Sequence, residues 1–162
     1  MEAHAPTPAI EATLLFLRRD DQVLLAMKKR GFGKDWYNGV GGKLDPGETV
    51  EQAAVRECQE EIGVTPKDLE KVATLEFQFA KKDGGPQPDM NVHVYFCEKW
   101  TGEPTETEEM APEWFNVASI PYSRMWEDDP YWLPVALTGR KITGTFVFGP
   151  DNKLITSTVQ NA

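Results

Sequence analysis

The chain has 162 residues, of which 40% are hydrophobic and 27% are charged, a composition that suits one folded domain with a sizeable core. Its formal net charge of −9 at pH 7 argues against a general binder of nucleic-acid polymers or membrane surfaces, because both need a basic surface. Two cysteines, Cys58 and Cys97, are too few for a disulfide scaffold or a zinc site, and no apolar run approaches the length of a membrane span.

The start of the chain has neither a basic stretch nor an apolar core. Residues 1–10 are therefore predicted to be a disordered tail rather than a signal peptide, and residues 11–162 a single domain. Two apolar runs follow, Ala12–Leu17 and Val23–Met27, separated by Arg18-Arg19-Asp20-Asp21. This pattern predicts a β-hairpin.

The next segment, Gly31–Gly42, is rich in glycine and polar residues and is predicted to be a loop. A helix is predicted from Thr49 to Ile62. Thr49 is a good N-cap, Gln52 completes a capping box with it, and Gly63 stands where a helix-ending glycine is expected.

The second half of the chain contains alternating apolar and polar residues, which are typical of strands. The predicted elements are a hairpin of Val72–Phe79 and Met90–Cys97 around a loop at 81–89, a strand at Glu113–Val117, a helix at Pro130–Leu137, and a hairpin of Thr143–Phe148 and Leu154–Val159. Many strands with two helices indicate an α+β protein, built as an α/β/α sandwich around a central mixed sheet.

The helix predicted at 49–62 carries an acidic cluster. At about 100° per residue, Glu57, Glu60 and Glu61 lie side by side, and Glu61 falls on the rim of the face that should be buried. The apolar stripe of that face consists of Val50, Ala54, Cys58 and Ile62. A divalent cation such as Mg²⁺ would remove the repulsion between these acids, because it takes carboxylate oxygens as ligands. The alternative is a solvated acidic face that binds no ion.

The acidic helix belongs to a longer pattern of fixed residues. The pattern places Gly, Glu, Arg-Glu, Glu-Glu and Gly at set spacings, here at Gly42, Glu48, Arg56, Glu57, Glu60, Glu61 and Gly63. It resembles the Nudix box, the signature of a family of metal-dependent pyrophosphohydrolases, at all its fixed identities. Cys58 is the one soft departure, since this position is usually aliphatic, and cysteine packs as a small hydrophobe.

The resemblance implies a Nudix fold with a metal site. The expected ligands of Mg²⁺, or of Mn²⁺ as a substitute, are Gly41, Glu57, Glu60, Glu61 and Glu109. Bound metal would lower the pKa of an attacking water, and Glu57, Glu61 or Glu109 would take the proton. Arg56 and Glu48 would hold the catalytic loop against the helix; the alternative is an ordinary surface ion pair.

The glycines before the box have an expected role of their own. Gly41 and Gly42 would let the backbone approach metal and phosphate closely, and Lys43 would meet a phosphate oxygen. Gly-Gly-Lys also occurs in P-loops, but those need Ser or Thr after the lysine, and this chain has Leu44.

Other segments resemble the branch of the family that hydrolyses oxidised purine nucleoside triphosphates, the eukaryotic MutT homologues. The strongest matches are Met27–Gly33, Asn38–Lys43 and Met125–Trp132. Besides Gly41, Gly42 and Lys43, the resemblance implies a substrate pocket of Thr13, Lys28, Phe32, Asn38, Val40, Phe77, Met90, Met110, Trp126, Glu127, Asp128 and Asp129. Each of these residues, taken alone, also has an alternative as a core, cap or turn residue.

Four of these residues would read the base. Trp126 would stack on the ring and Asn38 would bind its edge. Asp128 and Asp129 are adjacent, and two desolvated carboxyls rarely both stay charged, so one tends to keep a proton. A protonated and an ionised acid together would present a donor and an acceptor to oxidised guanine or oxidised adenine.

Three features depart from this branch. Val40 stands where a bulkier aromatic is expected, Tyr37 stands where tryptophan is usual, and the loop at 81–89 is longer. They affect the width of the pocket and the preference for a base rather than the chemistry.

The predicted function is hydrolysis of 8-oxo-dGTP and 2-hydroxy-dATP to the monophosphate and pyrophosphate, which sanitises the nucleotide pool. The alternatives are another Nudix substrate, such as ADP-ribose, a dinucleoside polyphosphate or an mRNA cap, and a non-catalytic Nudix-fold binding module. The expected protein is a cytoplasmic monomer, with the nuclear or mitochondrial pool as an alternative location, and its partner is a small nucleotide rather than a nucleic-acid polymer or a membrane.

Overall fold

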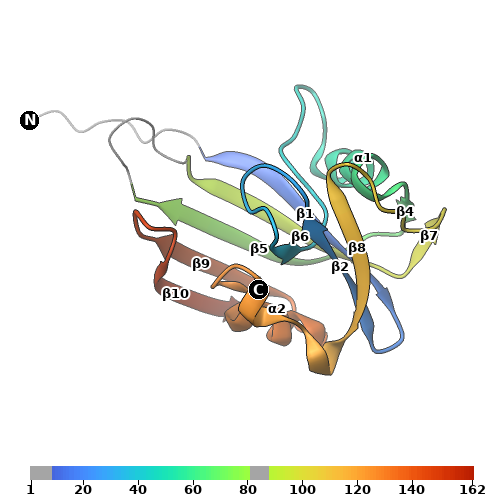
Figure 1. Cartoon of the computed structure of the whole chain (residues 1–162). Helices are drawn as coiled ribbons and strands as arrows, with labels where there is room; N and C mark the ends of the chain where they lie inside the picture. The colour runs from blue at the N-terminus through green and yellow to red at the C-terminus, as the bar shows by residue number, and fades with distance from the viewer. Residues whose placement is uncertain (1–8, 81–87) are drawn as a thin grey trace, which may run out of the picture.

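The computed structural model describes residues 9–80 and 88–162 (Figure 1). The tail predicted at 1–10 and the loop predicted at 81–89 fall almost wholly outside the described residues, although Ile10 already belongs to the first strand. Among the described residues, no helix is long and apolar enough to cross a membrane.

A mixed sheet forms the centre of the described chain. Its strands are β1 (Ile10–Arg19), β2 (Gln22–Lys28), β3 (Tyr37–Asn38), β5 (Glu70–Phe79), β6 (Met90–Cys97), β8 (Met110–Asn116), β9 (Ile142–Phe148) and β10 (Leu154–Asn161). Their order is β10-β9-β5-β6-β1-β2-β3, and β8 pairs with β2. β1 runs parallel to β6 and β5 parallel to β9, whereas the other pairs are antiparallel. The predicted mixed sheet is confirmed.

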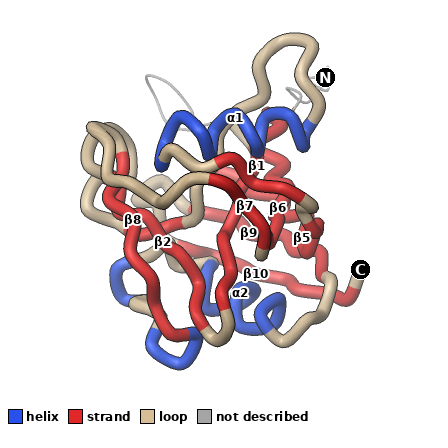
Figure 2. The backbone as a smooth tube through the Cα atoms, turned by 90° about the vertical axis from the view of Figure 1, so that its right-hand side faces the viewer, coloured by secondary structure: helices blue, strands red, loops and turns tan. Residues whose placement is uncertain are grey.

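Helices cover both faces of this sheet, as Figure 2 shows. α1 (Val50–Ile62) lies on one face and α2 (Asp129–Leu137) on the other. The smaller elements are a second sheet of β4 (Thr65–Lys67) and β7 (Lys99–Thr101), and the 3-10 turns η1 (Val117–Ser119) and η2 (Tyr122–Arg124). The α/β/α sandwich predicted from the sequence is therefore present.

Alternation along the central strands divides the core into two clusters. Leu15 and Leu17 of β1 pack with Ala54, Cys58 and Ile62 of α1. Phe16, between them, points to the other side and joins the cluster that contains Trp132 and Leu133 of α2. Because successive side chains of a strand point to opposite faces, β1 contributes to both clusters at once.

The predicted first hairpin is correct only near its turn. β1 and β2 pair at Arg18–Val23 and Arg19–Gln22 and then diverge, since β1 continues along β6 and β2 along β8. The segment after β3 lies beside β1, with bridges from Leu15 to Val40 and from Ala12 to Lys43. The divergence of the two strands positions the site described next.

Candidate active site

The acidic helix α1 has the ends that the sequence predicts. The hydroxyl of Thr49 accepts a hydrogen bond from the backbone N–H of Gln52, and the side chain of Gln52 accepts one from the N–H of Thr49. Gly63 ends the helix in the left-handed conformation, with φ of 72°. The capping box and the terminal glycine fix which residues of α1 face the sheet.

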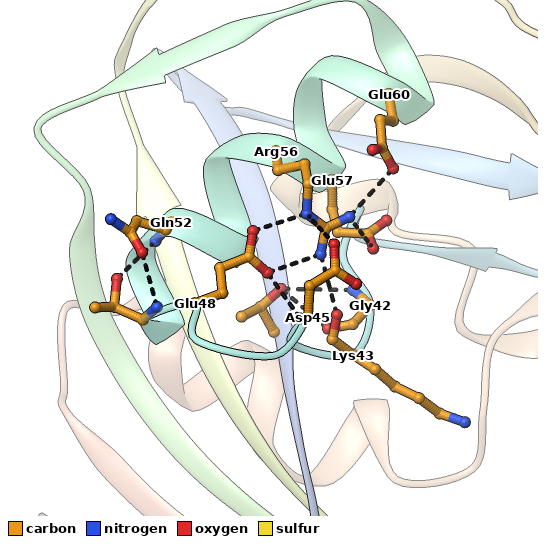
Figure 3. A network of polar contacts seen from close by, with 10 residues as sticks. Gly42, Lys43, Asp45, Glu48, Gln52, Arg56, Glu57 and Glu60 are labelled. Carbon is orange, nitrogen blue, oxygen red and sulfur yellow. Dashed lines mark hydrogen bonds and ion pairs between the residues drawn. The ribbon is translucent and has the colours of Figure 1, made fainter.

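Arg56 is the centre of a polar network around the start of α1 (Figure 3). Its Nε and Nη2 donate to the two carboxylate oxygens of Glu48 at 2.8 and 2.9 Å, which is the pairing expected from the sequence. Nη1 reaches Glu57 at 3.0 Å and Glu60 at 3.2 Å, and Nη2 also donates to the carbonyl of Lys43. The hydrogen bonds from Arg56 and from the backbone of Asp45 lower the pKa of Glu48 to about 2, so this fork ties the loop to the helix in its charged form.

Glu61 is the buried acid of the cluster, with 5% of its surface exposed. Burial, followed by the neighbouring carboxylate of Glu57, raises the pKa of Glu61 to about 9. Its Oε2 atom is one of two buried side-chain oxygens in the described residues that have no hydrogen-bond partner. An unpartnered oxygen beside a second acid matches what a hard divalent cation binds.

The two glycines that precede Lys43 are in tight contacts of different kinds. A Cβ on Gly41 would lie 1.9 Å from the carbonyl oxygen of Thr13, whereas a Cβ on Gly42 would lie 2.6 Å from Oε1 of Glu57. The backbone at Gly41 therefore packs against β1, and the backbone at Gly42 packs against an acid of α1. Gly41 has no room for a side chain because its neighbour is backbone, whereas a Cβ at Gly42 would have to displace the carboxylate of Glu57.

Arginines bind most of the predicted acidic ligands in this structure. Among residues 9–80 and 88–162, no group of three His, Cys, Asp or Glu side chains is gathered around one point. Arg56 holds Glu60, which is 58% exposed, and Arg30 holds Glu109 at 3.2 Å. Two arginines thus neutralise three of the predicted ligands, Glu57, Glu60 and Glu109, and the ligand set stays a prediction.

A cavity of about 490 Å³ opens where β1 and β2 diverge. Thirteen of the residues predicted for the substrate line it: Thr13, Lys28, Phe32, Asn38, Gly41, Gly42, Lys43, Phe77, Met90, Met110, Trp126, Asp128 and Asp129. The acids of α1 are absent from the lining, but Gly42 joins the two sites, since it lines the cavity and contacts Glu57.

Two predicted pocket residues lie elsewhere. Val40 is 3% exposed and packs in the α1-side cluster, because its bridge to Leu15 turns its side chain towards that face. Glu127 is exposed, and its carboxylate accepts a hydrogen bond from the backbone N–H of Leu154 at 2.7 Å. Neither belongs to the cavity.

Aromatic residues that the sequence reading did not single out complete the cavity. They are Trp36, Phe79 and Phe148. The indole of Trp126 lies 5.1 Å from the ring of Phe32, 5.4 Å from that of Trp36 and 6.2 Å from that of Phe148. Phe32 and Trp36 are 54% and 39% exposed, and such exposed rings beside a cavity offer an apolar surface to a planar ligand.

Asp128 and Asp129 lie in the same cavity, 4% and 2% exposed. Burial raises the pKa of Asp128 to about 6, although Nε1 of Trp132 donates to its Oδ2 at 2.9 Å. Burial and the adjacent Asp128 raise the pKa of Asp129 further, and its Oδ2 has no partner. Burial thus disfavours two charges on this pair, and the hydrogen bond from the indole N–H favours the charged form of Asp128.

Comparison with known proteins places this geometry in a family. The model of the NUDIX domain matches residues 8–136. The oxidized purine nucleoside triphosphate hydrolase of Danio rerio is 44% identical over 136 residues (84% of this chain and 85% of that protein), and the protein of the same name from Mus musculus is 42% identical over 143 residues (88% and 89%). A crystal structure of a MutT protein from Bacillus halodurans superposes with a TM-score of 0.80 at 25% identity and covers 93% of this chain and 97% of that one. The chain belongs to the Nudix family of hydrolases.

Proposed function

We propose that the protein hydrolyses oxidised purine nucleoside triphosphates, such as 8-oxo-dGTP and 2-hydroxy-dATP, to the monophosphate and pyrophosphate. One observation carries the substrate class: a buried pair of acids, Asp128 and Asp129, lines an aromatic cavity, and Gly42 in the same lining touches the acidic helix. The names of the Danio rerio and Mus musculus relatives agree with this choice.

The acid pair supplies a donor and an acceptor for the base. Protonated Asp129 donates from its carboxyl, and ionised Asp128 accepts from a ring or exocyclic N–H. Asn38 adds an amide at the cavity, although its Oδ1 already accepts from the N–H of Gly39 at 2.8 Å. Its side-chain NH₂ is the group left to meet a purine acceptor. Unmodified guanine lacks the N7–H that oxidation at C8 creates, so it offers one donor fewer to the cavity.

Nudix hydrolases need a divalent metal, and for this chain we propose Mg²⁺, with Mn²⁺ as a substitute. Glu57 and Glu61 fit such an ion because Glu61 is buried with an unpartnered oxygen beside a second carboxylate. Glu60 and Glu109 are further candidate ligands that Arg56 and Arg30 neutralise in this structure. When bound, the ion supplies charge neutralisation and lowers the pKa of a coordinated water.

The chain's own residues do the remaining work. Lys28 and Lys43 line the cavity and offset the phosphate charge that a protein of net charge −9 would otherwise repel. A carboxylate of Glu57, Glu61 or Glu109 takes a proton from the attacking water, a P–O bond forms to that oxygen, and the anhydride P–O bond breaks to release pyrophosphate. The Arg56–Glu48 fork keeps the loop of Gly42 and Lys43 in place throughout.

The test compares kcat/KM for 8-oxo-dGTP, 2-hydroxy-dATP, a methylated purine triphosphate and dGTP, with ADP-ribose and a dinucleoside polyphosphate as rival substrates. We expect the oxidised purines to rank above dGTP in the native protein and the ranking to change in Asp128→Asn. An unchanged ranking would refute the role of the acid pair. Preference for ADP-ribose would refute the proposed substrate class, and no metal-stimulated turnover at all would refute the proposed catalysis.

A cytoplasmic monomer remains a prediction for this protein.

A further inference from the structure

The C-terminal end of α1 is capped by a distant loop. A helix leaves its last carbonyls without partners inside the helix, and a basic side chain in the last turn often compensates. α1 has no basic residue there. Instead, the backbone N–H of Thr105 donates to the carbonyl of Ile62 at 3.0 Å, and the hydroxyl of Thr107 donates to the carbonyl of Glu61 at 2.9 Å.

The hydroxyl of Thr107 both donates and accepts hydrogen bonds. Besides donating to Glu61, the hydroxyl oxygen lies within hydrogen-bond distance of the backbone N–H groups of Glu109, at 3.3 Å, and Met110, at 3.2 Å. The backbone N–H of Thr107 donates to the carbonyl of Met110 at 2.9 Å, which closes the turn. The side chain of Thr107 thus links Glu61, the buried acid of α1, to Glu109 in the turn at 106–110.

Lys29, which directly follows β2, also binds the turn at 106–110. Its ammonium binds Glu106 at 2.6 Å and the carbonyl of Thr107 at 2.9 Å, and its backbone N–H donates to the carbonyl of Glu109 at 2.8 Å. Lys28, the residue before it, lines the cavity, and so does Met110. The turn at 106–110 is therefore held by α1 on one side and by Lys29 at the end of β2 on the other, and its last residue, Met110, lines the cavity.

We propose that Thr107, supported by Lys29, is a positioning residue that sets the distance between Glu109 and the Glu57–Glu61 pair, and thereby the affinity for a divalent cation. The inference rests on the proposed function only for the choice of a divalent ion. Thr107 does not line the cavity; it acts through the backbones of Glu61 and Glu109. Residues that orient ligands in this way typically change metal affinity by about ten-fold or more when they are replaced.

The test measures binding of Mn²⁺ alone to the full chain, without nucleotide, by the loss of the electron paramagnetic resonance signal of the free ion. Thr107→Val keeps the shape of the side chain and removes the hydroxyl, and we expect the Kd for Mn²⁺ to rise about ten-fold. Thr107→Ser keeps the hydroxyl and should bind as the native protein does. Thr105→Val is the matched control, because the hydroxyl of Thr105 bonds only within the loop, to the carbonyl of Glu103 at 2.8 Å.

Activity gives a second, separate readout. In Thr107→Val we expect the Mg²⁺ concentration for half-maximal rate to rise, while KM for the nucleotide at saturating Mg²⁺ stays within about two-fold of the native value. Equal Mn²⁺ affinity in Thr107→Val and Thr105→Val would overturn the inference. If Thr107→Val does not fold, Lys29→Met replaces it, because this change removes the contacts of the ammonium with Glu106 and Thr107. We again expect the Kd for Mn²⁺ to rise, and an affinity equal to that of Thr105→Val would overturn the inference.

The two proposals fail in different ways. A native protein that hydrolyses oxidised purines, together with a Thr107→Val variant of unchanged Mn²⁺ affinity, sinks the positioning role alone. A native protein that binds Mn²⁺ through this arrangement but prefers another nucleotide sinks the proposed substrate alone.

Discussion

At the scale of single residues, adjacent glycines have different consequences for the protein. The close contact at Gly41 is with the backbone of Thr13, which cannot move without shifting β1. The close contact at Gly42 is with the end of the Glu57 side chain, which can rotate away. The same chemical change, addition of one methyl group, should therefore affect folding at one position and catalysis at the other.

Gly42→Ala is expected to fold and to lose activity. The added Cβ displaces the carboxylate of Glu57, and misplacement of a catalytic group by about 1 Å lowers kcat/KM on the order of 100-fold. Circular dichroism and the melting temperature should stay close to those of the native protein. Gly41→Ala is the paired variant and should instead lose the native melting transition. A Gly42→Ala variant with native kcat/KM would show that Glu57 has no part in the reaction.

The acid pair in the cavity costs stability at neutral pH. Asp128 and Asp129 have raised pKa values in the folded protein, so the unfolded chain releases their protons at lower pH than the folded protein does. Their cost is absent below the unfolded pKa values, near 3.8, and grows as the pH rises through the folded pKa of Asp128, about 6. A shift of that size corresponds to about 3 kcal/mol.

Asp129→Asn should therefore stabilise the protein more at about pH 8 than at about pH 4, by on the order of 1–3 kcal/mol in urea unfolding. It should also lower kcat/KM for oxidised purines, because an amide cannot replace a carboxyl that shifts its proton. Asp68→Asn is the control, because it makes the same chemical change at an exposed side chain on the protein surface. Equal stabilisation at both pH values by Asp129→Asn would mean that Asp129 is charged in the folded protein.

At the scale of elements, the sequence predicts those structures whose signals are local. α1 begins and ends as predicted because Thr49, Gln52 and Gly63 act within a few residues of one another. Strand pairing is not local: the turn between β1 and β2 is readable, but the divergence of the strands depends on β6 and β8, which lie far along the chain. The cavity exists because of that divergence, so no local pattern predicts its shape.

The difference between local and long-range signals also explains which site residues the sequence predicts correctly. The Nudix box is one continuous segment, and its spacing is readable. The cavity takes residues from several elements, and which of two neighbours faces it depends on register: Tyr37 is buried and pairs with Met27, whereas Trp36, one residue earlier, faces the cavity. Val40 was misplaced for the same reason, because its bridge to Leu15 fixes its direction.

The loop between β2 and β3 supplies a rigid aromatic support. The N–H of Lys28 donates to the carbonyl of Trp36 at 3.0 Å, that of Asp35 to the carbonyl of Lys28 at 2.8 Å, and that of Trp36 to the carbonyl of Gly33 at 3.1 Å. These bonds hold the rings of Phe32 and Trp36 against Trp126. The loop thus fixes the indole on which a purine would stack.

Trp36→Ala should raise KM for 8-oxo-dGTP by about five-fold or more, since an aromatic contact around a base contributes roughly 1–3 kcal/mol, while kcat changes little. Trp36→Phe should retain most of the affinity. Trp100→Ala, which removes an indole stacked on Trp114 at 5.8 Å and outside the cavity lining, controls for the loss of a large side chain. An unchanged KM in Trp36→Ala would exclude the loop from base recognition.

At the scale of the whole molecule, the proposed site spans both layers of the sandwich. The acidic helix α1 packs on one face of the sheet, and the acid pair sits at the start of α2 on the other. The two halves meet where β1 passes between them, with Thr13 contacting the Gly42 segment and Ala12 and Leu14 lining the cavity. Binding of one nucleotide across both halves requires that the two layers keep a fixed relation.

The shared strands predict that the two clusters unfold together. Leu15 is 1% exposed in the α1-side cluster, and Leu133 is fully buried in the α2-side cluster. Leu15→Ala and Leu133→Ala should each lower the free energy of unfolding by about 2–5 kcal/mol, and Ile155→Ala, at a side chain 63% exposed, by less than about 0.5 kcal/mol. Tryptophan fluorescence and far-ultraviolet circular dichroism should report one coincident transition in every variant, because β1 and β6 cannot lose one face and keep the other. A variant in which the two signals separate would show that the layers fold independently, and the nucleotide site would then depend on docking of two units rather than on one core.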